Sequence, residues 1–466
     1  MDEEHESSAH RTFRDPAGSV EIRKDSVYRS VKGRYAKDLL EFLESPLATR
    51  LVAEGRLVGS EVVANSGDGL LLRHPRIAFI SYPSEWPAAL WLEAANLTLD
   101  LCSELIAEGW ILKDATPLNV LFDGSRAVFV DVLSIERMDP NRSIWLAYGQ
   151  FVRTFILPML AHTFLGWPLQ TAQTRRDGFE PEDIYAALPL LRRFRQPALS
   201  SVTLPILLSK LLPQKSGEPG GGVPKGEMAD AEITRKVMLR TLRNLKTAMQ
   251  RAAPGQRKSA WSDYSDTAGH YSGSDHDEKQ KFVAEILQEC KPATLLDVGC
   301  NIGVYSRIAA DTGAAVVAID TDSEVLDRLC RQLKGSGKDI LPLCIDLAYP
   351  TPATGWDNRE GASFLSRCEG HFDTVMMLAV IHHLLLSAQI PMEHIAALVS
   401  RIANRNLILE WVPPTDPKYI EVLRGREAIY EHITEDALRA AFAPHFNVAK
   451  EALLGNGRIL FWMVKP

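Results

Sequence analysis

The sequence has few cysteines, and it lacks the spacing that marks disulfide-rich or zinc-binding segments. Its six cysteines are scattered along 466 residues without a C-x-x-C pair, which indicates reduced, mostly buried thiols and no metal site. No apolar run approaches the roughly 18 residues that a membrane-spanning helix requires. The polar, acidic start of the chain also differs from a secretory signal. These absences favour a cytoplasmic protein that does not span a membrane.

An excess of positive charge is absent as well. The net charge of -7 gives no global attraction to nucleic acid or to anionic membranes, although a local patch can still provide one. The chain is too long for one compact core, so two domains are expected. A stretch over 213–225 is rich in Pro, Gly and Ser and is typical of a linker. We therefore expect a disordered tail over 1–12, a first domain over 13–212, a linker over 213–278 and a second domain over 279–466.

The G-x-G-x-x-G fingerprint of dinucleotide-binding enzymes is missing from the most informative stretch, residues 295–306. A buried strand there ends in Asp297-x-Gly299-x-Asn301-x-Gly303 and leads into a helix. This pattern resembles motif I of class I S-adenosylmethionine (SAM) methyltransferases. The resemblance implies that the glycines admit the cofactor against bare backbone and that the carboxylate orients its ammonium end. A tight strand-to-helix turn in another α/β protein is the alternative.

Polar residues end the apolar runs that follow, as a doubly wound sheet with a ligand at its carboxyl edge predicts. Asp320 ends the second run and is placed to hold ribose hydroxyls, whereas Asp346 ends the third. In methyltransferases an acid at the latter position commonly meets the adenine amino group. Leu378, in the fourth run, completes the expected cofactor site. Any single acid of this series can instead be a helix cap or a salt-bridge partner.

Three residues beyond these runs are candidate catalytic groups. Methyl transfer from a sulfonium is an in-line displacement, so positioning is the main task and a base is needed only if the acceptor must lose a proton. His382, His383 and Glu410 lie where such a base is expected. His383-Leu384 resembles the His-Leu that often follows the fourth strand in this superfamily. A histidine that caps a helix, and a glutamate in a salt bridge, are the alternative interpretations.

A further set of aromatic and polar residues is suited to binding the acceptor. It combines a loop after the third strand, the end of the fifth strand and a segment that can close over SAM: Trp356, Asn358, Arg359, Trp411, Tyr264 and Tyr271. The loop residues can equally form a solvated loop. The two tyrosines can instead fix the linker to the domain.

The first domain contains a sparse phosphotransferase pattern. Asp114 and Asn119 match the D-x-x-x-x-N of a kinase catalytic loop, and Asp131 falls where kinases place a metal-binding acid. Lys113, the residues after Asp131 and the missing Gly-rich loop depart from that pattern. We therefore expect a degenerate kinase-like domain that binds substrate or supports the second domain, rather than active phosphoryl transfer.

Two other segments carry specific expectations. Residues 77–82 are predicted to form a strand. Residues 232–251 are predicted to form an amphipathic helix with an apolar face of Met238, Leu242, Leu245 and Met249. The opposite face of that helix is basic over 235–251. It is either an RNA-docking surface or the solvated side of a connecting helix.

Taken together, the motifs at 112–120, 129–136, 297–303 and 410–416 resemble the two-domain class I methyltransferases that include rhizobial host-specific nodulation proteins of the NoeA type. The resemblance implies an α/β fold, in which an α+β kinase-like domain precedes a C-terminal Rossmann-like, seven-stranded SAM methyltransferase domain. It implies methyl transfer from SAM to a small or sugar-containing acceptor. An RNA methyltransferase that docks through the basic helix and a non-catalytic SAM-binding scaffold remain the alternatives. The oligomeric state stays open.

Overall fold

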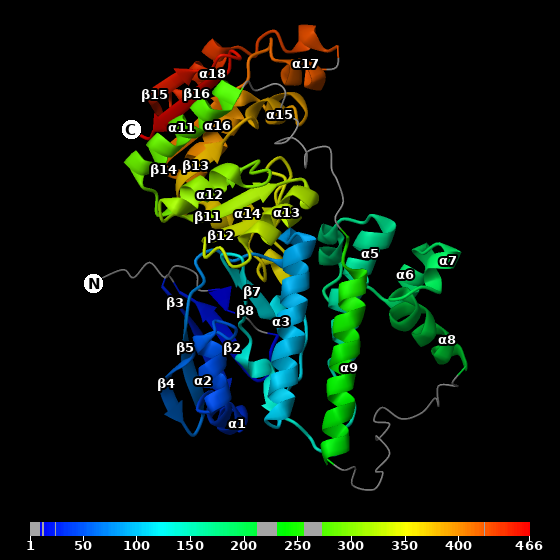
Figure 1. Cartoon of the computed structure of the whole chain (residues 1–466). Helices are drawn as coiled ribbons and strands as arrows, with labels where there is room; N and C mark the ends of the chain where they lie inside the picture. Colours follow the sequence, from blue (N-terminus) through cyan, green and yellow to red (C-terminus); the bar gives the residue numbers. More distant parts are fainter. Residues whose placement is uncertain (1–9, 12–13, 24, 212–230, 256–272, 424) are drawn as a thin grey trace. The chain divides into compact units, whose positions relative to one another are not determined.

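The computed structural model describes residues 10–11, 14–23, 25–211, 231–255, 273–423 and 425–466. The chain divides into two compact units, of which the first comprises 1–122 and 126–255 and the second 123–125 and 256–466. Figure 1 shows both along the chain. Expected residues Tyr264 and Tyr271 lie outside the described ranges, as does most of the expected linker.

The first unit begins with a five-stranded antiparallel sheet of order β1-β2-β3-β5-β4. Its strands are β1 His10–Arg11, β2 Gly18–Ile22, β3 Ser26–Lys32, β4 Glu61–Ser66 and β5 Gly69–Pro75, and helices α1 Gly33–Leu43 and α2 Pro46–Ala53 connect β3 to β4. In β5 the buried side chains alternate with more exposed ones, as expected for a sheet with one face on a core.

The expected strand over 77–82 is wrong. The ladder ends at Pro75, and the chain continues irregularly into a short 3-10 turn, η1 Pro83–Glu85. Side chains replace strand partners there, because the Tyr82 amide donates to Glu85 at 2.9 Å and Trp86 Nε1 donates to Ser81 Oγ at 3.0 Å. Such local side-chain bonds compete with a sheet ladder.

The rest of the first unit is mainly helical, with two short hairpin-like sheets. The long helix α3 Ala88–Ala107 precedes β6 Trp110–Leu112, which pairs with β9 Ile135–Arg137, while β7 Val120–Asp123 pairs with β8 Arg126–Phe129. The helices that follow are α4 Tyr148–Phe151, α5 Leu157–Leu165, α6 Pro181–Ala187, α7 Leu190–Arg193, α8 Leu204–Leu211 and α9 Ala231–Ala252.

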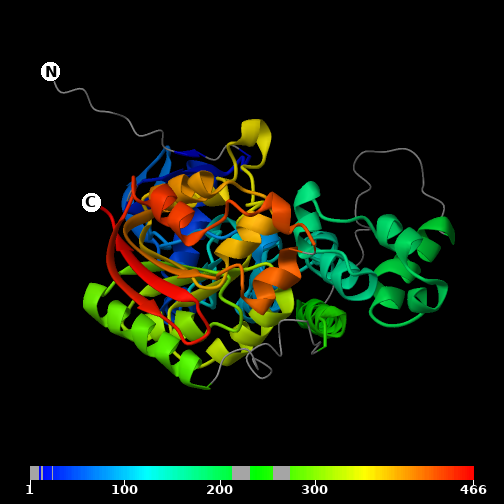
Figure 2. The same cartoon turned by 90° about the horizontal axis from the view of Figure 1, so that it is seen from above.

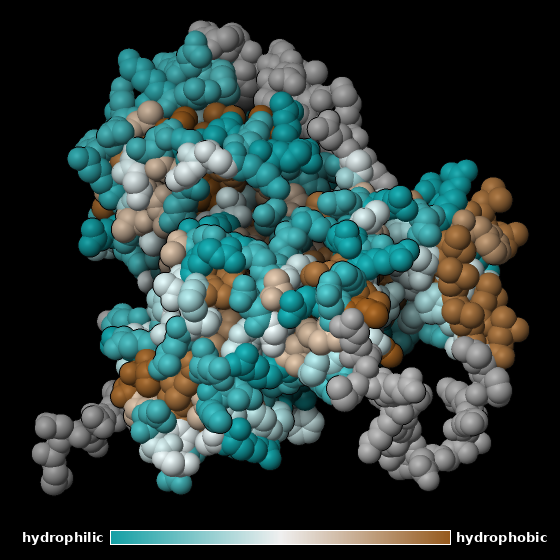
Figure 3. Space-filling model, turned by 60° about the horizontal axis from the view of Figure 1, so that its bottom comes forward, coloured by the Kyte–Doolittle hydropathy of each residue, from teal (hydrophilic) through white to brown (hydrophobic). Residues whose placement is uncertain are grey.

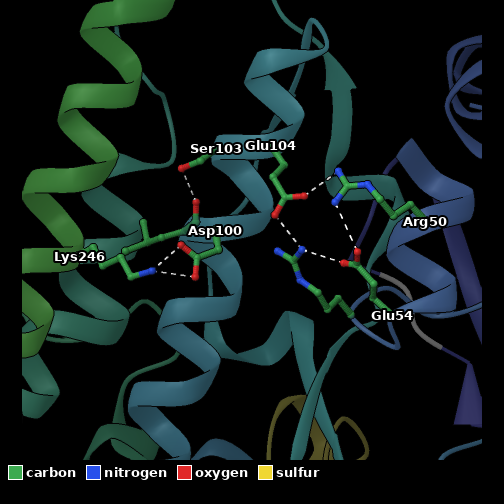
Figure 4. Close-up of polar contacts among 8 residues, drawn as sticks. Arg50, Glu54, Asp100, Ser103, Glu104 and Lys246 are labelled. Carbon is green, nitrogen blue, oxygen red and sulfur yellow. Dashed lines mark hydrogen bonds and ion pairs between the residues drawn. The ribbon is translucent and has the colours of Figure 1, made fainter. Parts of the chain in front are cut away.

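Helix α9 packs along α3 and therefore belongs to the first unit, whereas its sequence pattern suggested part of a linker. Its four predicted core residues are all buried, which confirms the 3.6-residue periodicity. Lys246 Nζ donates to both carboxylate oxygens of Asp100 on α3, at 2.6 and 2.8 Å (Figure 4). On the other side of α3, Glu104 pairs with Arg50 and Arg56. These ion pairs and the apolar stripe hold α3 between its neighbours.

The second unit is built on a seven-stranded sheet of order β12-β11-β10-β13-β14-β16-β15. Its strands are β10 Thr294–Val298, β11 Ala315–Asp320, β12 Ile340–Cys344, β13 Phe372–Met377, β14 Ala403–Trp411, β15 Asn447–Leu453 and β16 Ile459–Val464. The first five are mutually parallel and read as near-continuous apolar runs, as strands covered on both faces do. Strand β16 runs in the opposite direction and pairs antiparallel with both β14 and β15.

Helices connect these strands and complete the unit. They are α11 Gly273–Cys290, α12 Val304–Asp311, α13 Ser323–Leu333, α14 Phe364–Cys368, α15 Ile381–Leu386, α16 Met392–Ile402, α17 Pro417–Leu423 and α18 Glu435–Phe442. Helix α11 packs beside α12 and against β16, and α16 packs beside α18; Figure 2 shows α11 next to the last two strands. The resulting core joins strands and helices around Leu295, Val316 and Met376. Within the described residues, no helix is long and apolar enough to cross a membrane.

Candidate active site

The turn after β10 is tied to the end of the neighbouring strand. The amides of Gly299 and Cys300 both donate to the Ile319 carbonyl of β11, at 2.8 and 3.0 Å. Gly299, Asn301 and Gly303 have φ angles of 71°, 49° and 72°, the left-handed region that favours glycine and, next, asparagine. The spacing of these residues in the sequence therefore follows from the backbone that the turn adopts.

Each glycine of the turn is also required by close packing. A Cβ at Gly299 would lie 2.3 Å from Val380 Cγ2, and one at Gly303 would lie 2.5 Å from Leu329 Cδ1. Close packing against the protein's own side chains therefore requires glycine at both positions. The glycines shape the turn, whose backbone amides and neighbouring acids lie at this edge of the sheet.

Asp320, the last residue of β11, is the best placed of these acids. Its Oδ2 accepts from the Asn301 amide at 2.8 Å and its Oδ1 from the Asp322 amide at 3.0 Å. The side chain is half-buried, and burial raises its pKa. Each carboxylate oxygen keeps a further lone pair, so the group can accept from two adjacent hydroxyls. A ribose diol supplies two hydroxyl donors that match these acceptors.

Asp297 lies deeper than the sequence pattern suggested. It is 2% exposed in β10 and accepts a hydrogen bond from Ser306 Oγ of α12 at 2.5 Å. Burial raises its pKa to about 7, although the bond from Ser306 opposes that rise. Burial therefore disfavours the charged form of Asp297, and a cationic group brought to this edge would favour that form.

The remaining cofactor residues differ in their exposure. Asp346, just beyond β12, is exposed, and its Oδ1 accepts from the Ala348 amide at 2.8 Å. Leu378, just beyond β13, is buried and belongs to the sheet's core. Because β10 to β13 are parallel, their carboxyl ends meet along one edge, and all the expected cofactor residues gather there.

The two histidines sit side by side at the start of α15, with ring centroids 4.1 Å apart. His382 is buried, its Nδ1 has no hydrogen-bond partner among the described residues, and burial lowers its pKa to about 3. His383 is only half-buried; burial lowers its pKa as well, although Glu421 on α17 raises it. Both rings are therefore neutral at pH 7. Only His383 also has an exposed portion.

Glu410 belongs to a buried ion network whose partners the sequence interpretation did not name. It is fully buried at the end of β14, where its Oε2 accepts from Lys279 Nζ of α11 at 2.5 Å and its Oε1 from Arg458 Nη1 at 3.1 Å. Arg458 Nε donates to Asp416 Oδ2 at 2.7 Å. Burial raises the pKa of Asp416, but Arg458 outweighs it and leaves that pKa below its usual range. Glu410 is thus engaged on both oxygens and fits the salt-bridge interpretation better than that of a general base.

The acceptor candidates are scattered over different environments. Trp411 is 2% exposed and packs in the core, whereas Trp356 is 70% exposed. Trp356 and Asn358 lie in η7 Trp356–Asn358, within a loop that Thr354 and Gly361 close by an isolated β-bridge, and exposed Arg359 follows. All three of these loop residues are exposed.

The phosphotransferase pattern of the first unit is internally paired. Arg29 Nη1 of β3 donates to Asp131 Oδ1 at 2.8 Å, and Ser134 Oγ donates to Asp131 Oδ2. Asn119 Nδ2 donates to Ser134 Oγ at 3.1 Å. Burial raises the pKa of Asp114, which disfavours its charged form. In the described parts of the chain, no cluster of three His, Cys, Asp or Glu residues is arranged to hold a metal ion.

The strand order of the second unit, its antiparallel β16 and the acid that ends β11 beside a glycine turn define a class I methyltransferase, an enzyme whose methyl donor is SAM. A family model described as a methyltransferase domain matches residues 272–412. The nodulation protein NoeA of Rhizobium meliloti (strain 1021) is 30% identical over 471 residues, covering 97% of this chain and 94% of that protein. The chain therefore belongs to the NoeA family.

Solved structures with a similar fold include other methyltransferases. Magnesium protoporphyrin IX methyltransferase of Synechocystis is 19% identical, covers 41% of this chain and 84% of its own, and has a TM-score of 0.30. The N-methyltransferase NodS of Bradyrhizobium japonicum is 12% identical over 42% of this chain and 98% of its own, with a TM-score of 0.30. The bifunctional kinase-methyltransferase WbdD is 19% identical over 40% of this chain and 39% of its own, at a TM-score of 0.30. At these TM-scores the likenesses carry no argument about acceptor or mechanism.

Proposed function

We propose that this protein transfers the methyl group of SAM to a small or sugar-containing acceptor by in-line displacement. The observation that carries the proposal is the meeting of Asp320 with the motif turn at the carboxyl edge of a sheet in the class I order. Placing donor and acceptor in line on such an edge can supply roughly 7–11 kcal/mol of the barrier reduction. When bound, SAM supplies an electrophilic methyl on a cationic sulfur.

Three acids would hold the cofactor in this proposal. Asp320 would accept from the ribose hydroxyls, since its oxygens are already oriented by two backbone amides. Asp346 is exposed beyond the neighbouring strand and would meet the adenine amino group. Asp297 would balance the positive charge of the methionine portion through its own ionisation. Gly299, Asn301 and Gly303 would keep the turn in place.

We assign the acceptor side of the site to His383, which is half-buried and neutral at pH 7. A neutral imidazole can accept the proton of a hydroxyl or amine as the methyl transfers. His382 has a pKa of about 3 and is a poor base, but its unpartnered Nδ1 can hydrogen-bond a ligand. Trp356, Asn358, Arg359, Tyr264 and Tyr271 remain acceptor candidates.

The test is transfer of labelled methyl from SAM to a panel of monosaccharides, oligosaccharides and RNA. We expect label in a sugar-containing product, and a rate roughly a hundredfold lower or more for His383→Ala if it is the base. His394→Ala is the matched control, because His394 is exposed on α16. Label in RNA alone would overturn the acceptor class. SAM binding without transfer to any acceptor would favour the scaffold interpretation.

A further inference from the structure

A large apolar surface covers the helical pair α7 and α8 of the first unit. Large hydrophobic side chains there are between 41% and 80% exposed: Leu190, Leu191, Phe194, Leu204, Leu207, Leu208 and Leu211. Figure 3 shows them as a continuous apolar area on the right of the molecule. Single exposed apolar residues are normal, but a contiguous group of this size on a helical surface marks a binding site.

The same segment is basic and contains no acid. Between Pro189 and Leu211 the sequence has Arg192, Arg193, Arg195 and Lys210 but neither Asp nor Glu. Arg192 and Arg195 are exposed. This local charge stands out in a chain whose net charge is -7. Apolar and cationic groups are therefore concentrated on one short segment of an otherwise acidic protein.

Hydrogen bonds hold α7 in place relative to the residues around it. Arg193 Nε donates to the Leu188 carbonyl at 3.0 Å, and Thr203 Oγ1 donates to the Arg193 carbonyl at 2.6 Å. The second bond ties α7 to the π-helical segment η6 Leu199–Thr203, which leads directly into α8, so the leucines of both helices are presented by one structured element. Ile206, on the inner side of α8, is buried. The outward leucines are thus the face that this packing leaves uncovered by described residues.

We propose that the α7–α8 surface docks on an anionic lipid membrane as a peripheral contact. Leucine and phenylalanine side chains can enter the boundary between headgroups and acyl chains, while flanking arginines meet the lipid phosphates. Charge also argues against a second copy of the chain as the occupant, because pairing two identical surfaces would bring their arginines together. A bilayer satisfies the apolar and the cationic groups at once.

The acidic remainder of the chain gives the contact an orientation. The net negative charge of the chain is repelled by anionic lipid. Helix α9 is also basic, but its exposed large hydrophobic side chains are Ile233 and Val237, so the α7–α8 surface combines positive charge with the larger apolar area. The absence of a spanning helix among the described residues agrees with a reversible, surface-bound state. The net charge of the whole chain does not reveal the positive α7–α8 segment, because acidic residues elsewhere outweigh it.

The experiment is flotation of the full-length protein with two kinds of vesicle. One contains equal amounts of phosphatidylglycerol and phosphatidylcholine, and the other contains phosphatidylcholine alone. We expect binding to the anionic vesicles, weakened by added salt. Replacing Arg192 and Arg195 by Gln should reduce the partition coefficient about fivefold for each charge removed. Flotation that is equal for both vesicles would overturn the electrostatic part of the proposal.

The apolar part is tested by Leu191→Asp combined with Leu208→Asp, which should abolish flotation. Leu146→Asp is the matched control, since Leu146 is a 63% exposed leucine of the same unit; it should leave flotation unchanged. Unaltered SAM binding and thermal unfolding in all variants would show that they fold. Flotation unaffected by the double substitution would overturn the proposal. So would lipid-free self-association, measured by sedimentation, that the double substitution removes, because it would assign the surface to a second copy.

Discussion

At the scale of single residues, burial decides what the acids of the second unit can do. Asp320 and Glu410 both end parallel strands and look alike in the sequence, yet one is half-buried on backbone amides and the other is enclosed by two cations. The acid at the end of β11 was predictable from the order of strands. A salt bridge at Glu410 was one of two interpretations, but its partners Lys279 and Arg458 were not predictable, because they lie 131 and 48 positions away.

The ion network gives a prediction for stability. Glu410→Gln removes the carboxylate that Lys279 and Arg458 share and leaves Arg458 with Asp416, which should cost about 3–5 kcal/mol in the free energy of unfolding. Glu451→Gln removes a carboxylate from an exposed pair with Arg439 and should cost less than about 1 kcal/mol. Urea unfolding measures both. Equal effects of the two substitutions would contradict a stabilising role of the buried network.

The raised pKa of Asp297 gives a prediction for pH dependence. A carboxyl whose pKa rises from 3.8 to about 7 on folding contributes stability that is present below pH 3.8 and is lost as pH rises towards 7. Asp297→Asn should therefore reduce the loss of unfolding free energy between pH 5 and pH 8 by at most roughly 3 kcal/mol, because about two pKa units of the shift fall within that window. Urea unfolding at both pH values is the measurement. A wild-type and variant difference that does not change with pH would refute the shift.

At the scale of elements, short sequence patterns predicted the features that depend on residues close together in the chain. The strand-turn-helix at the motif and the apolar stripe of α9 were both readable, because each depends on residues close in sequence. The hairpin of β4 and β5 was not anticipated, since the β4 side chains are all exposed and show no alternation. The packing of α9 on α3 was also hidden, because it depends on a distant partner, Asp100.

The motif turn itself can be tested by a pair of glycine substitutions. Gly299→Ala adds both a positive-φ penalty and a Cβ that would meet Val380, whereas Gly313→Ala at φ 93° adds the penalty with no atom within 4 Å. We expect Gly313→Ala to cost about 1 kcal/mol and Gly299→Ala distinctly more. Thermal unfolding distinguishes the two. Equal losses would show that close packing at the turn is not the reason for Gly299.

At the scale of the whole molecule, the chain combines a methyltransferase unit with an α+β unit in which Asp131 of the phosphotransferase pattern pairs with Arg29. The division into two units was expected from length, but the pairing of Arg29 with Asp131 was not, because the two residues lie 102 positions apart. Overall charge was similarly uninformative about the α7–α8 surface. Chain length and net charge limit the number of domains and the classes of partner, whereas the fold determines which residues contact one another.

The first unit should not bind ATP in a magnesium-dependent way. Arg29 supplies the positive charge that a metal ion would provide at Asp131, and Ser134 occupies the other carboxylate oxygen. Fluorescent ATP titrations with and without magnesium should therefore give the same, weak response. Magnesium-dependent binding that Asp131→Ala abolishes would contradict this account and restore the phosphotransferase interpretation.

The most direct measurement of the central claim is calorimetric titration of the full chain with SAM. We predict saturable binding that Asp320→Asn weakens roughly tenfold or more, because hydrogen bonds to a charged carboxylate are lost. Asp311→Asn, on an exposed side chain at the end of α12, should bind as the wild type does. Absence of SAM binding, or binding that Asp320→Asn leaves unchanged, would contradict the assignment of this edge as the methyl-donor site.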